Sequence, residues 1–268
     1  MQKFSVLLSV YKKERPEWLR ESLASVFRQT AMPAEVVLVQ DGPLTEELEA
    51  VIREYATAHP ELKVVPLEKN VGLGRALNAG LRHCSHELVA RMDTDDICKP
   101  WRFERQLRVF EEMPGTDISS AWIDEFETDK EHIVSQRKLP EKHEDIVRYA
   151  KKRCPVNHVA VMYRRDKVLA LGGYQGFPED YLLWIRMIMD GWTFYNIPES
   201  LLWVRFSPEV IKRRGGWKYA KQDILAQWNF HKMGFTNWRE LTWNVIVRGI
   251  VRMIPNTMRT WIYRHLIR

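Results

Sequence analysis

Four short apolar runs that alternate with amphipathic segments constrain the fold of this chain most strongly. The runs are Phe4 to Val10, Glu35 to Val39, Leu62 to Leu67 and Glu87 to Met92. Each has the length of a strand, and the segments between them repeat apolar residues at helical spacing. Those repeats are Leu19, Leu23, Val26 and Phe27 after Pro16, then Leu48, Val51, Ile52 and Tyr55, and then a third segment that starts at Asn70. This alternation predicts an α/β fold with a parallel sheet.

Three carboxylates follow the fourth run directly: Asp93, Asp95 and Asp96. In open α/β sheets, ligands bind beyond the carboxyl ends of the strands, so we expect these side chains at a binding site. Clustered oxygen ligands suit a hard cation such as Mg²⁺ or Mn²⁺, which commonly binds substrate phosphates as well. The alternative is that the acids cap the helix expected near Pro100.

Composition narrows the class of protein. The chain has 268 residues, of which 45% are hydrophobic and 28% charged, so it can bury a full core but is too polar for an integral membrane bundle. Its three cysteines are widely spaced, which fits a reducing cytosol, and the N-terminal apolar run is too short for a signal peptide. The net charge of +6 is uneven, because residues 201–268 hold 13 Lys and Arg against 3 acidic residues.

Gly72 and Gly74 invite comparison with a dinucleotide-binding loop. The third glycine of that pattern is replaced by Leu77, and no acidic residue closes the next strand in the usual place. A Rossmann cofactor site is therefore not predicted.

Five motifs, taken in order, resemble those of the family 2 glycosyltransferases. They are Ser9-Val-Tyr11, Val39-Gln-Asp41-Gly42, Asn70-x-Gly72-x-x-Arg75, Asp93-x-Asp95-Asp96, and Gly172-Gly-Tyr174 followed by Glu179-Asp180-x-x-Leu183-Trp184. The resemblance implies a GT-A fold, a Rossmann-like nucleotide-sugar-binding mixed sheet flanked by helices, here with a C-terminal helical extension. Within the family, the opening strand and the Asp41-Gly-Pro-Leu turn look most like bacterial enzymes that build O-antigen or exopolysaccharide repeat units.

The resemblance also implies a donor site for a UDP-sugar. It assigns nucleotide-sugar binding to Ser9, Tyr11, Asp41, Asn70, Arg75, Asp93 and Thr94, and binding of Mn²⁺ or Mg²⁺ to Asp95 and Asp93. One departure is Gln40, which stands where the family often has a second acid. Asp41 is alternatively a turn former before Gly-Pro, and Arg75 is alternatively a solvated helix residue.

On the acceptor side, Asp180 is the expected general base. Transfer requires that the attacking hydroxyl lose its proton, and a carboxylate within hydrogen-bond reach serves this purpose. Asp180 precedes an apolar helix that would hold it rigidly, although Glu179 and Asp180 are alternatively mere helix-start acids. Glu179, Trp184 and His158 are further acceptor-side candidates, with a packed core histidine as the alternative for His158.

The predicted organisation is a catalytic domain over 1–206, with a nucleotide-sugar half (1–98) and an acceptor half (99–206), followed by a basic tail (207–268). In the acceptor half we expect strands at Ile118 to Ile123 and Cys154 to Met162, and a polar helix at Glu141 to Ala150. In the tail we expect helices at Trp217 to Met233, Trp238 to Ile254 and Met258 to Ile267.

The longest apolar run in the tail is too short to span a membrane. Its tryptophans and arginines instead predict a surface for anionic lipid, and the alternative is packing on the core or on a dimer partner. Nucleic-acid binding is not expected, since no known module is present.

The predicted activity is therefore inverting, metal-dependent transfer of a hexose, glucose or galactose, from a UDP-sugar to a polyprenyl-diphosphate-linked saccharide. The expected location is cytoplasmic, peripheral on the inner face of the cytoplasmic membrane. Two alternatives come from other classes: a D-x-D phosphatase and a non-catalytic membrane or nucleic-acid adaptor. The oligomeric state is left open.

Overall fold

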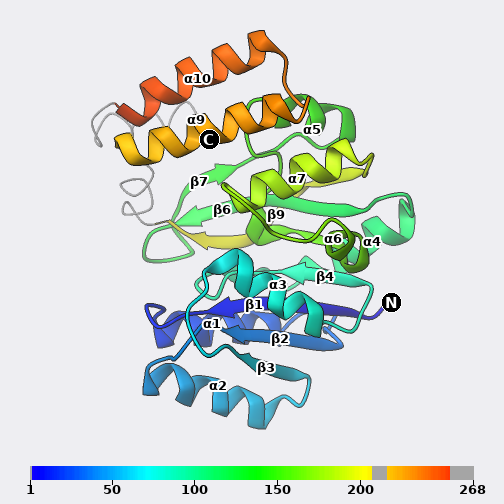
Figure 1. The fold of residues 1–268 in the computed structure, drawn as a ribbon. Coiled ribbons are helices and arrows are strands. Elements are labelled where there is room, and N and C mark those ends of the chain that lie inside the picture. Colours follow the sequence, from blue (N-terminus) through cyan, green and yellow to red (C-terminus); the bar gives the residue numbers. More distant parts are fainter. Residues whose placement is uncertain (1, 207–215, 254–268) are drawn as a thin grey trace.

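The computed structural model describes residues 2–206 and 216–253, which form one nine-stranded mixed sheet with helices on both faces (Figure 1). Eight strands follow the order β3-β2-β1-β4-β8-β6-β9-β5, and β7 pairs with β6 outside this path. The predicted α/β class is confirmed.

The first four strands make the parallel half of the sheet. They are β1 (Phe4–Val10), β2 (Glu35–Gln40), β3 (Leu62–Pro66) and β4 (Leu88–Arg91). Alternate residues of β1 enter opposite cores, because Val6 and Leu8 pack on one face of the sheet and Leu7 on the other. The four predicted strands are confirmed, with small shifts at their ends.

The second half of the sheet is mixed. β8 (Met162–Arg164) runs antiparallel to both β4 and β6 (Ile118–Phe126), so it joins the two halves. β9 (Phe194–Arg205) runs parallel to β6, and the short β5 (Ile97–Cys98) and β7 (Ile133–Arg137) are antiparallel to their neighbours.

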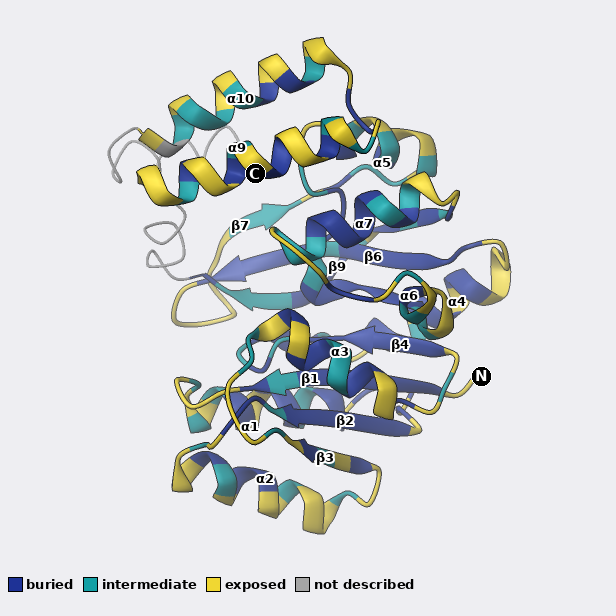
Figure 2. Ribbon diagram, in the orientation of Figure 1, coloured by how far each residue is buried: buried dark blue, intermediate teal, exposed yellow. Residues whose placement is uncertain are grey.

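Helices cover both faces, and the strands between them are mostly buried (Figure 2). One face carries α1 (Pro16–Val26), α2 (Glu46–Ala58) and α4 (Arg102–Glu112). The other carries α3 (Leu73–His83), α5 (His143–Ala150), α6 (Arg165–Ala170) and α7 (Glu179–Met189). The helices predicted in the first half are confirmed.

The strand predicted from Cys154 to Met162 is wrong for most of its length. The segment is irregular and contains a 3₁₀ turn at His158–Ala160, and only Met162 belongs to β8. Side chains take the place of a ladder: Asn157 Nδ2 donates to the Ala121 carbonyl over 2.8 Å, and Asn196 Nδ2 donates to the Pro155 carbonyl over 3.0 Å. Proline has no N–H, so it cannot take part in a central ladder as a donor.

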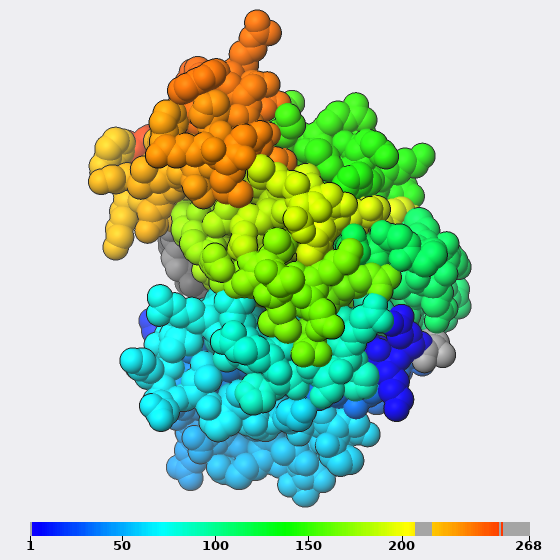
Figure 3. Space-filling model, turned by 45° about the vertical axis from the view of Figure 1, so that its right-hand side comes forward, coloured from blue at the N-terminus to red at the C-terminus, as the bar shows by residue number. Residues whose placement is uncertain are grey.

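The tail forms a helical hairpin of α9 (Trp217–Lys232) and α10 (Trp238–Met253), which agrees with the first two predicted tail helices. The predicted helix from Met258 to Ile267 lies outside the described residues. Phe230 and Ala226 of α9 pack against Tyr181 and Ile185 of α7. The hairpin thus packs on the acceptor half. It lies at the opposite end of the molecule from residues 1–98 (Figure 3). Among the described residues, no helix combines the length and the apolar character needed to cross a membrane.

Candidate active site

The candidate site lies where the parallel strands end. β1 pairs with β2 up to Val10 and Gln40, and β4 reaches the same edge through Arg91, which pairs with Leu7. The segments that follow these strands, beginning at Tyr11, Asp41 and Met92, therefore meet at one edge of the sheet. Three of the predicted donor motifs are brought together there.

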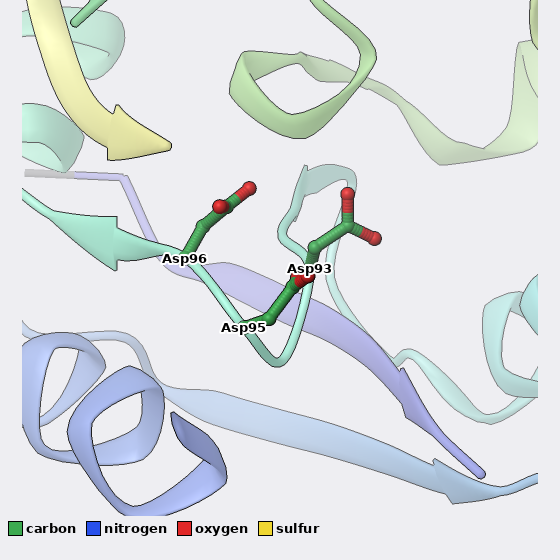
Figure 4. A group of neighbouring side chains, drawn as sticks. All are labelled: Asp93, Asp95 and Asp96. Carbon is green, nitrogen blue, oxygen red and sulfur yellow. The ribbon is translucent and has the colours of Figure 1, made fainter. Parts of the chain in front are cut away.

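Asp93, Asp95 and Asp96 project from the turn between β4 and β5 (Figure 4). One carboxylate oxygen from each lies within 4.8 Å of the others. Asp96 is buried and accepts a hydrogen bond from the backbone N–H of Arg205 over 2.9 Å. The capping alternative is wrong, because β5 separates the acids from α4, whose N-cap residue is Trp101.

The acids repel one another in a partly dry environment. Burial, followed by the charges of Asp93 and Glu14, raises the pKa of Asp95 to about 7. Burial and the charges of Asp95 and Asp93 raise the pKa of Asp96 well above its usual value. A divalent cation would relieve this repulsion, and an all-carboxylate donor set fits Mg²⁺ or Mn²⁺. The residues present therefore fit the predicted metal.

Two charged residues at this edge were missed by the sequence reasoning. Arg91 is 1% exposed and forms an ion pair with Asp93. Glu14, in the loop after β1, accepts a 2.8 Å hydrogen bond from Thr94 Oγ1, and burial raises its pKa. An acid three residues after Tyr11 was the only signal for Glu14. The signal for Arg91 was a charge at the end of an otherwise apolar strand.

Asp41 binds the loop that leads into α3. Its carboxylate accepts from the backbone N–H groups of Val71 (2.7 Å) and Gly72 (3.1 Å) and from Asn70 Nδ2 (2.9 Å). Gly42 follows in the left-handed region at φ 84°, where a Cβ would come within 2.4 Å of the Asn70 nitrogen. Asp41 and Asn70 are thus brought together, as part of a structured turn.

The remaining donor-side candidates differ in exposure. Tyr11 is 39% exposed and Arg75 is exposed on α3, so both are free to meet a ligand. Ser9 is partly buried at the end of β1, whereas Thr94 is buried, with its hydroxyl directed at Glu14.

Glu179 and Asp180 occupy the first turn of α7, as predicted. Glu179 Oε1 accepts a hydrogen bond from the backbone N–H of Gly74 over 3.1 Å, so it links α7 to the start of α3. Asp180 is partly exposed, with Oδ2 3.9 Å from the Cys154 thiol. Both Asp180 and Asp93 act electrostatically on the Tyr174 hydroxyl, although burial is the main reason why the pKa of Tyr174 is raised. Asp180 and Asp93 therefore both lie within electrostatic range of the buried Tyr174 hydroxyl.

His158 and Trp184 belong to an aromatic cluster that includes Tyr174. His158 Nε2 is 3.1 Å from the Tyr174 hydroxyl, and Trp184 packs edge-on against both rings. Trp184 has no exposed surface, and burial lowers the pKa of His158 well below its usual value. These contacts match the core-histidine alternative, and they place Trp184 in the hydrophobic core as well.

Known proteins resemble this chain along its whole length. The profile of the family described as "Glycosyl transferase family 2" matches residues 5–170. The amylovoran biosynthesis glycosyltransferase AmsE of Erwinia amylovora is 41% identical over 263 residues, which cover 97% of each chain. The UDP-Gal:alpha-D-GlcNAc-diphosphoundecaprenol beta-1,3-galactosyltransferase of Escherichia coli is 39% identical, over 99% of this chain and 97% of its own.

Solved structures resemble the fold. S. aureus TarS 1–349 in complex with UDP-GlcNAc superimposes with a TM-score of 0.67 at 17% identity, covering 99% of this chain and 76% of that one. The mannosyltransferase PcManGT from Pyrobaculum calidifontis, in complex with GDP-Man and Mn²⁺, gives a TM-score of 0.63 at 16% identity, covering 99% and 70%.

Proposed function

The chain belongs to glycosyl transferase family 2 and has the GT-A fold, and from this premise we propose that it transfers a hexose from a UDP-sugar to a polyprenyl-diphosphate-linked saccharide. The observation that carries the proposal is the cluster of Asp93, Asp95 and Asp96 at the strand ends. Of the two predicted hexoses, the name of the E. coli relative supports galactose, and that name also supports an N-acetylglucosamine-diphosphate-polyprenol acceptor. The phosphatase and adaptor alternatives leave this resemblance unexplained.

The chemistry divides between the two halves of the site. When bound, Mn²⁺ or Mg²⁺ supplies positive charge that stabilises the departing diphosphate. Asp95 is the main ligand that we propose for the cation. Tyr11 and Arg75 have exposed side chains, and we propose that they contact the nucleotide together with Ser9 and Asn70.

Asp180 removes the proton of the attacking hydroxyl. Its position at the start of a buried helix fixes the carboxylate, and Glu179 ties that helix to α3. Direct attack on the anomeric carbon needs only one such base and inverts the configuration of the sugar.

We also propose that the protein acts on the inner face of the cytoplasmic membrane. Two features support this location: exposed apolar side chains on α9 and α10, such as Trp238 and Trp243, and the excess of basic residues in the tail. A polyprenyl-linked acceptor would be reached at that surface.

The test is a transfer assay. The protein is incubated with UDP-galactose or UDP-glucose, a synthetic N-acetylglucosamine-diphosphate lipid, and Mn²⁺, Mg²⁺ or EDTA, and the lipid product is measured by mass spectrometry. We expect hexose addition that requires the cation. Asp95→Ala should abolish transfer and weaken UDP-sugar binding in Mn²⁺ with little change in stability. Full activity in EDTA would refute the metal assignment, and no hexose addition from either donor would refute the proposed reaction.

A further inference from the structure

We propose that Arg91 is a positioning residue for the acid cluster. Its guanidinium fixes the orientation of the Asp93 carboxylate and offsets part of the negative charge around a bound cation. This inference rests on the proposed metal-dependent transfer. Arg91 belongs to none of the five sequence motifs. Because Asp93 is paired with Arg91, we expect Asp93 to contribute less than Asp95 to binding of the cation.

The geometry of the pair is bidentate. Arg91 Nη1 donates to Asp93 Oδ2 over 2.9 Å, and Nη2 donates to Oδ1. Both oxygens of Asp93 are therefore directed at the guanidinium. A planar guanidinium that binds both oxygens fixes the plane of the carboxylate as well as its distance, which a lysine ammonium cannot do.

The environment makes Arg91 rigid. Its side chain is 1% exposed, whereas that of Asp93 is 37% exposed, so the arginine is the fixed partner. Its backbone is held on both sides: the N–H donates to the Val161 carbonyl over 2.9 Å, and the carbonyl accepts from Arg102 Nη2 over 2.6 Å. Arg91 thus orients Asp93 from inside the protein.

The charge of Arg91 reaches the whole cluster. Burial and neighbouring carboxylates raise the pKa of Asp95 and that of Asp96, and the Arg91 charge opposes both increases. Among residues 2–206 and 216–253, Asp93 is the member of the cluster that forms an ion pair with a basic side chain. Asp95 consequently keeps its carboxylate available for a cation, while Asp93 is shared with the arginine.

Arg91→Met should change cation binding and turnover in opposite directions. Removing the positive charge should tighten Mn²⁺ binding, on the order of tenfold or more, because a like charge close to the ion is lost. Turnover should fall at the same time, since Asp93 is no longer oriented. Mn²⁺ affinity is measured without substrates by titration followed by electron paramagnetic resonance of free Mn²⁺, and turnover by the transfer assay.

Two further variants separate charge from orientation. Arg91→Lys keeps the charge but loses the bidentate contact, so Mn²⁺ affinity should stay within about twofold of the native value while kcat falls and the donor KM rises. Arg91→Met combined with Asp93→Asn removes one charge of each sign, and Mn²⁺ affinity should return to near the native value.

Arg164→Met is the matched control. Arg164 is a partly buried arginine beside the start of β4, where it pairs with Leu88, and its guanidinium forms ion pairs with Glu87 and Asp117 rather than with the acid cluster. Its loss should destabilise the fold without tightening Mn²⁺, and thermal unfolding of every variant confirms that it is folded. Unchanged or weaker Mn²⁺ binding by folded Arg91→Met would overturn the proposal. Because this measurement uses no sugar donor, it stands apart from a failure of the transfer assay, which would instead count against the proposed function.

Discussion

Asp180 combines partial exposure with a rigid support. It lies in the first turn of α7, whose next residues Tyr181, Leu182 and Leu183 are buried, so the carboxylate has little freedom to move. The acid cluster, which we propose to hold the cation, is carried by a different element, the turn after β4. Loss of the base should therefore affect turnover and donor binding differently.

Asp180→Asn tests this separation. The change keeps the size of the side chain but removes its basicity, so kcat should fall about 10²-fold or more, while UDP-sugar binding in Mn²⁺ should persist. Asp190→Asn, at the other end of α7, is the control, since Asp190 accepts a hydrogen bond from Trp192 Nε1 far from the acids. Parallel loss of binding and turnover in Asp180→Asn would indicate a structural role, and a product that retains the donor's configuration would rule out single displacement.

His158 gives a prediction for pH. Burial lowers its pKa well below the usual 6.5, so the neutral imidazole is favoured in the folded protein. The unfolded chain then binds more protons than the folded one below about pH 6.5, and stability must fall as the pH decreases through that range. His158→Gln should lose less unfolding free energy between pH 8 and pH 5 than the native protein does, as measured by urea denaturation.

The same experiment has a control and a decisive outcome. Val168 is fully buried and does not titrate, so Val168→Ala should lower the unfolding free energy by the same amount at pH 8 and at pH 5. Other titrating groups, the acid cluster included, contribute equally to native and variant proteins and cancel in the comparison. An identical acid response in His158→Gln would show that His158 does not titrate abnormally.

The sequence predicted the positions of some site residues but not of others. Asp93, Asp95, Asp96 and Asp180 stand in motifs, so their positions at a strand end and a helix start could be predicted. Arg91 and Glu14 could not, because their importance comes from partners, Asp93 and Thr94, that only the folded chain places beside buried side chains. A charge next to an apolar run does not by itself reveal whether the side chain turns inward.

At the scale of elements, periodic patterns were reliable where helices and strands are regular. The hairpin of α9 and α10 agrees with two predicted helices, since its residues repeat at helical spacing. The segment before β8 was predicted wrongly, because side-chain amides replace ladder hydrogen bonds there and apolarity alone does not reveal this. Asn157 of the segment donates to the Ala121 carbonyl of β6, and Asn196 donates to the Pro155 carbonyl of the segment. The packing of the tail on α7 was left open by the sequence and is present in the structure.

Phe230→Ala tests the contribution of that packing. The Phe230 ring is 1% exposed and lies edge-on to Tyr181, with 5.0 Å between ring centroids. Its truncation should reduce the unfolding free energy by about 3–5 kcal/mol, the usual cost of losing a buried aromatic ring. Trp228→Ala, an exposed position two residues earlier in α9, should change stability much less. Similar small effects from both variants would mean that the hairpin adds little to the core.

For the whole molecule, charge and exposed apolar surface coincide in the tail. Residues 201–268 hold 13 Lys and Arg against 3 acids, whereas residues 1–200 hold 28 against 32. The exposed apolar residues of the hairpin include Trp238 (63% exposed), Trp243 (62%) and Ile250 (60%), and exposed Lys218, Lys221 and Arg239 lie on the same two helices. Side chains of these two kinds together favour an anionic lipid surface.

The last prediction is that the full chain binds anionic vesicles through this hairpin. Basic residues near a negatively charged membrane contribute roughly 1 kcal/mol each, so flotation with phosphatidylglycerol vesicles should exceed that with neutral phosphatidylcholine and should weaken as salt is added. Replacing Trp238 and Trp243 together by alanine should reduce flotation severalfold, because the aromatic rings supply the apolar contact. Trp101→Ala, an exposed tryptophan at the start of α4, should not. If flotation is equal with both vesicle types, or absent, the hairpin serves the fold alone and the peripheral location proposed for the protein is wrong.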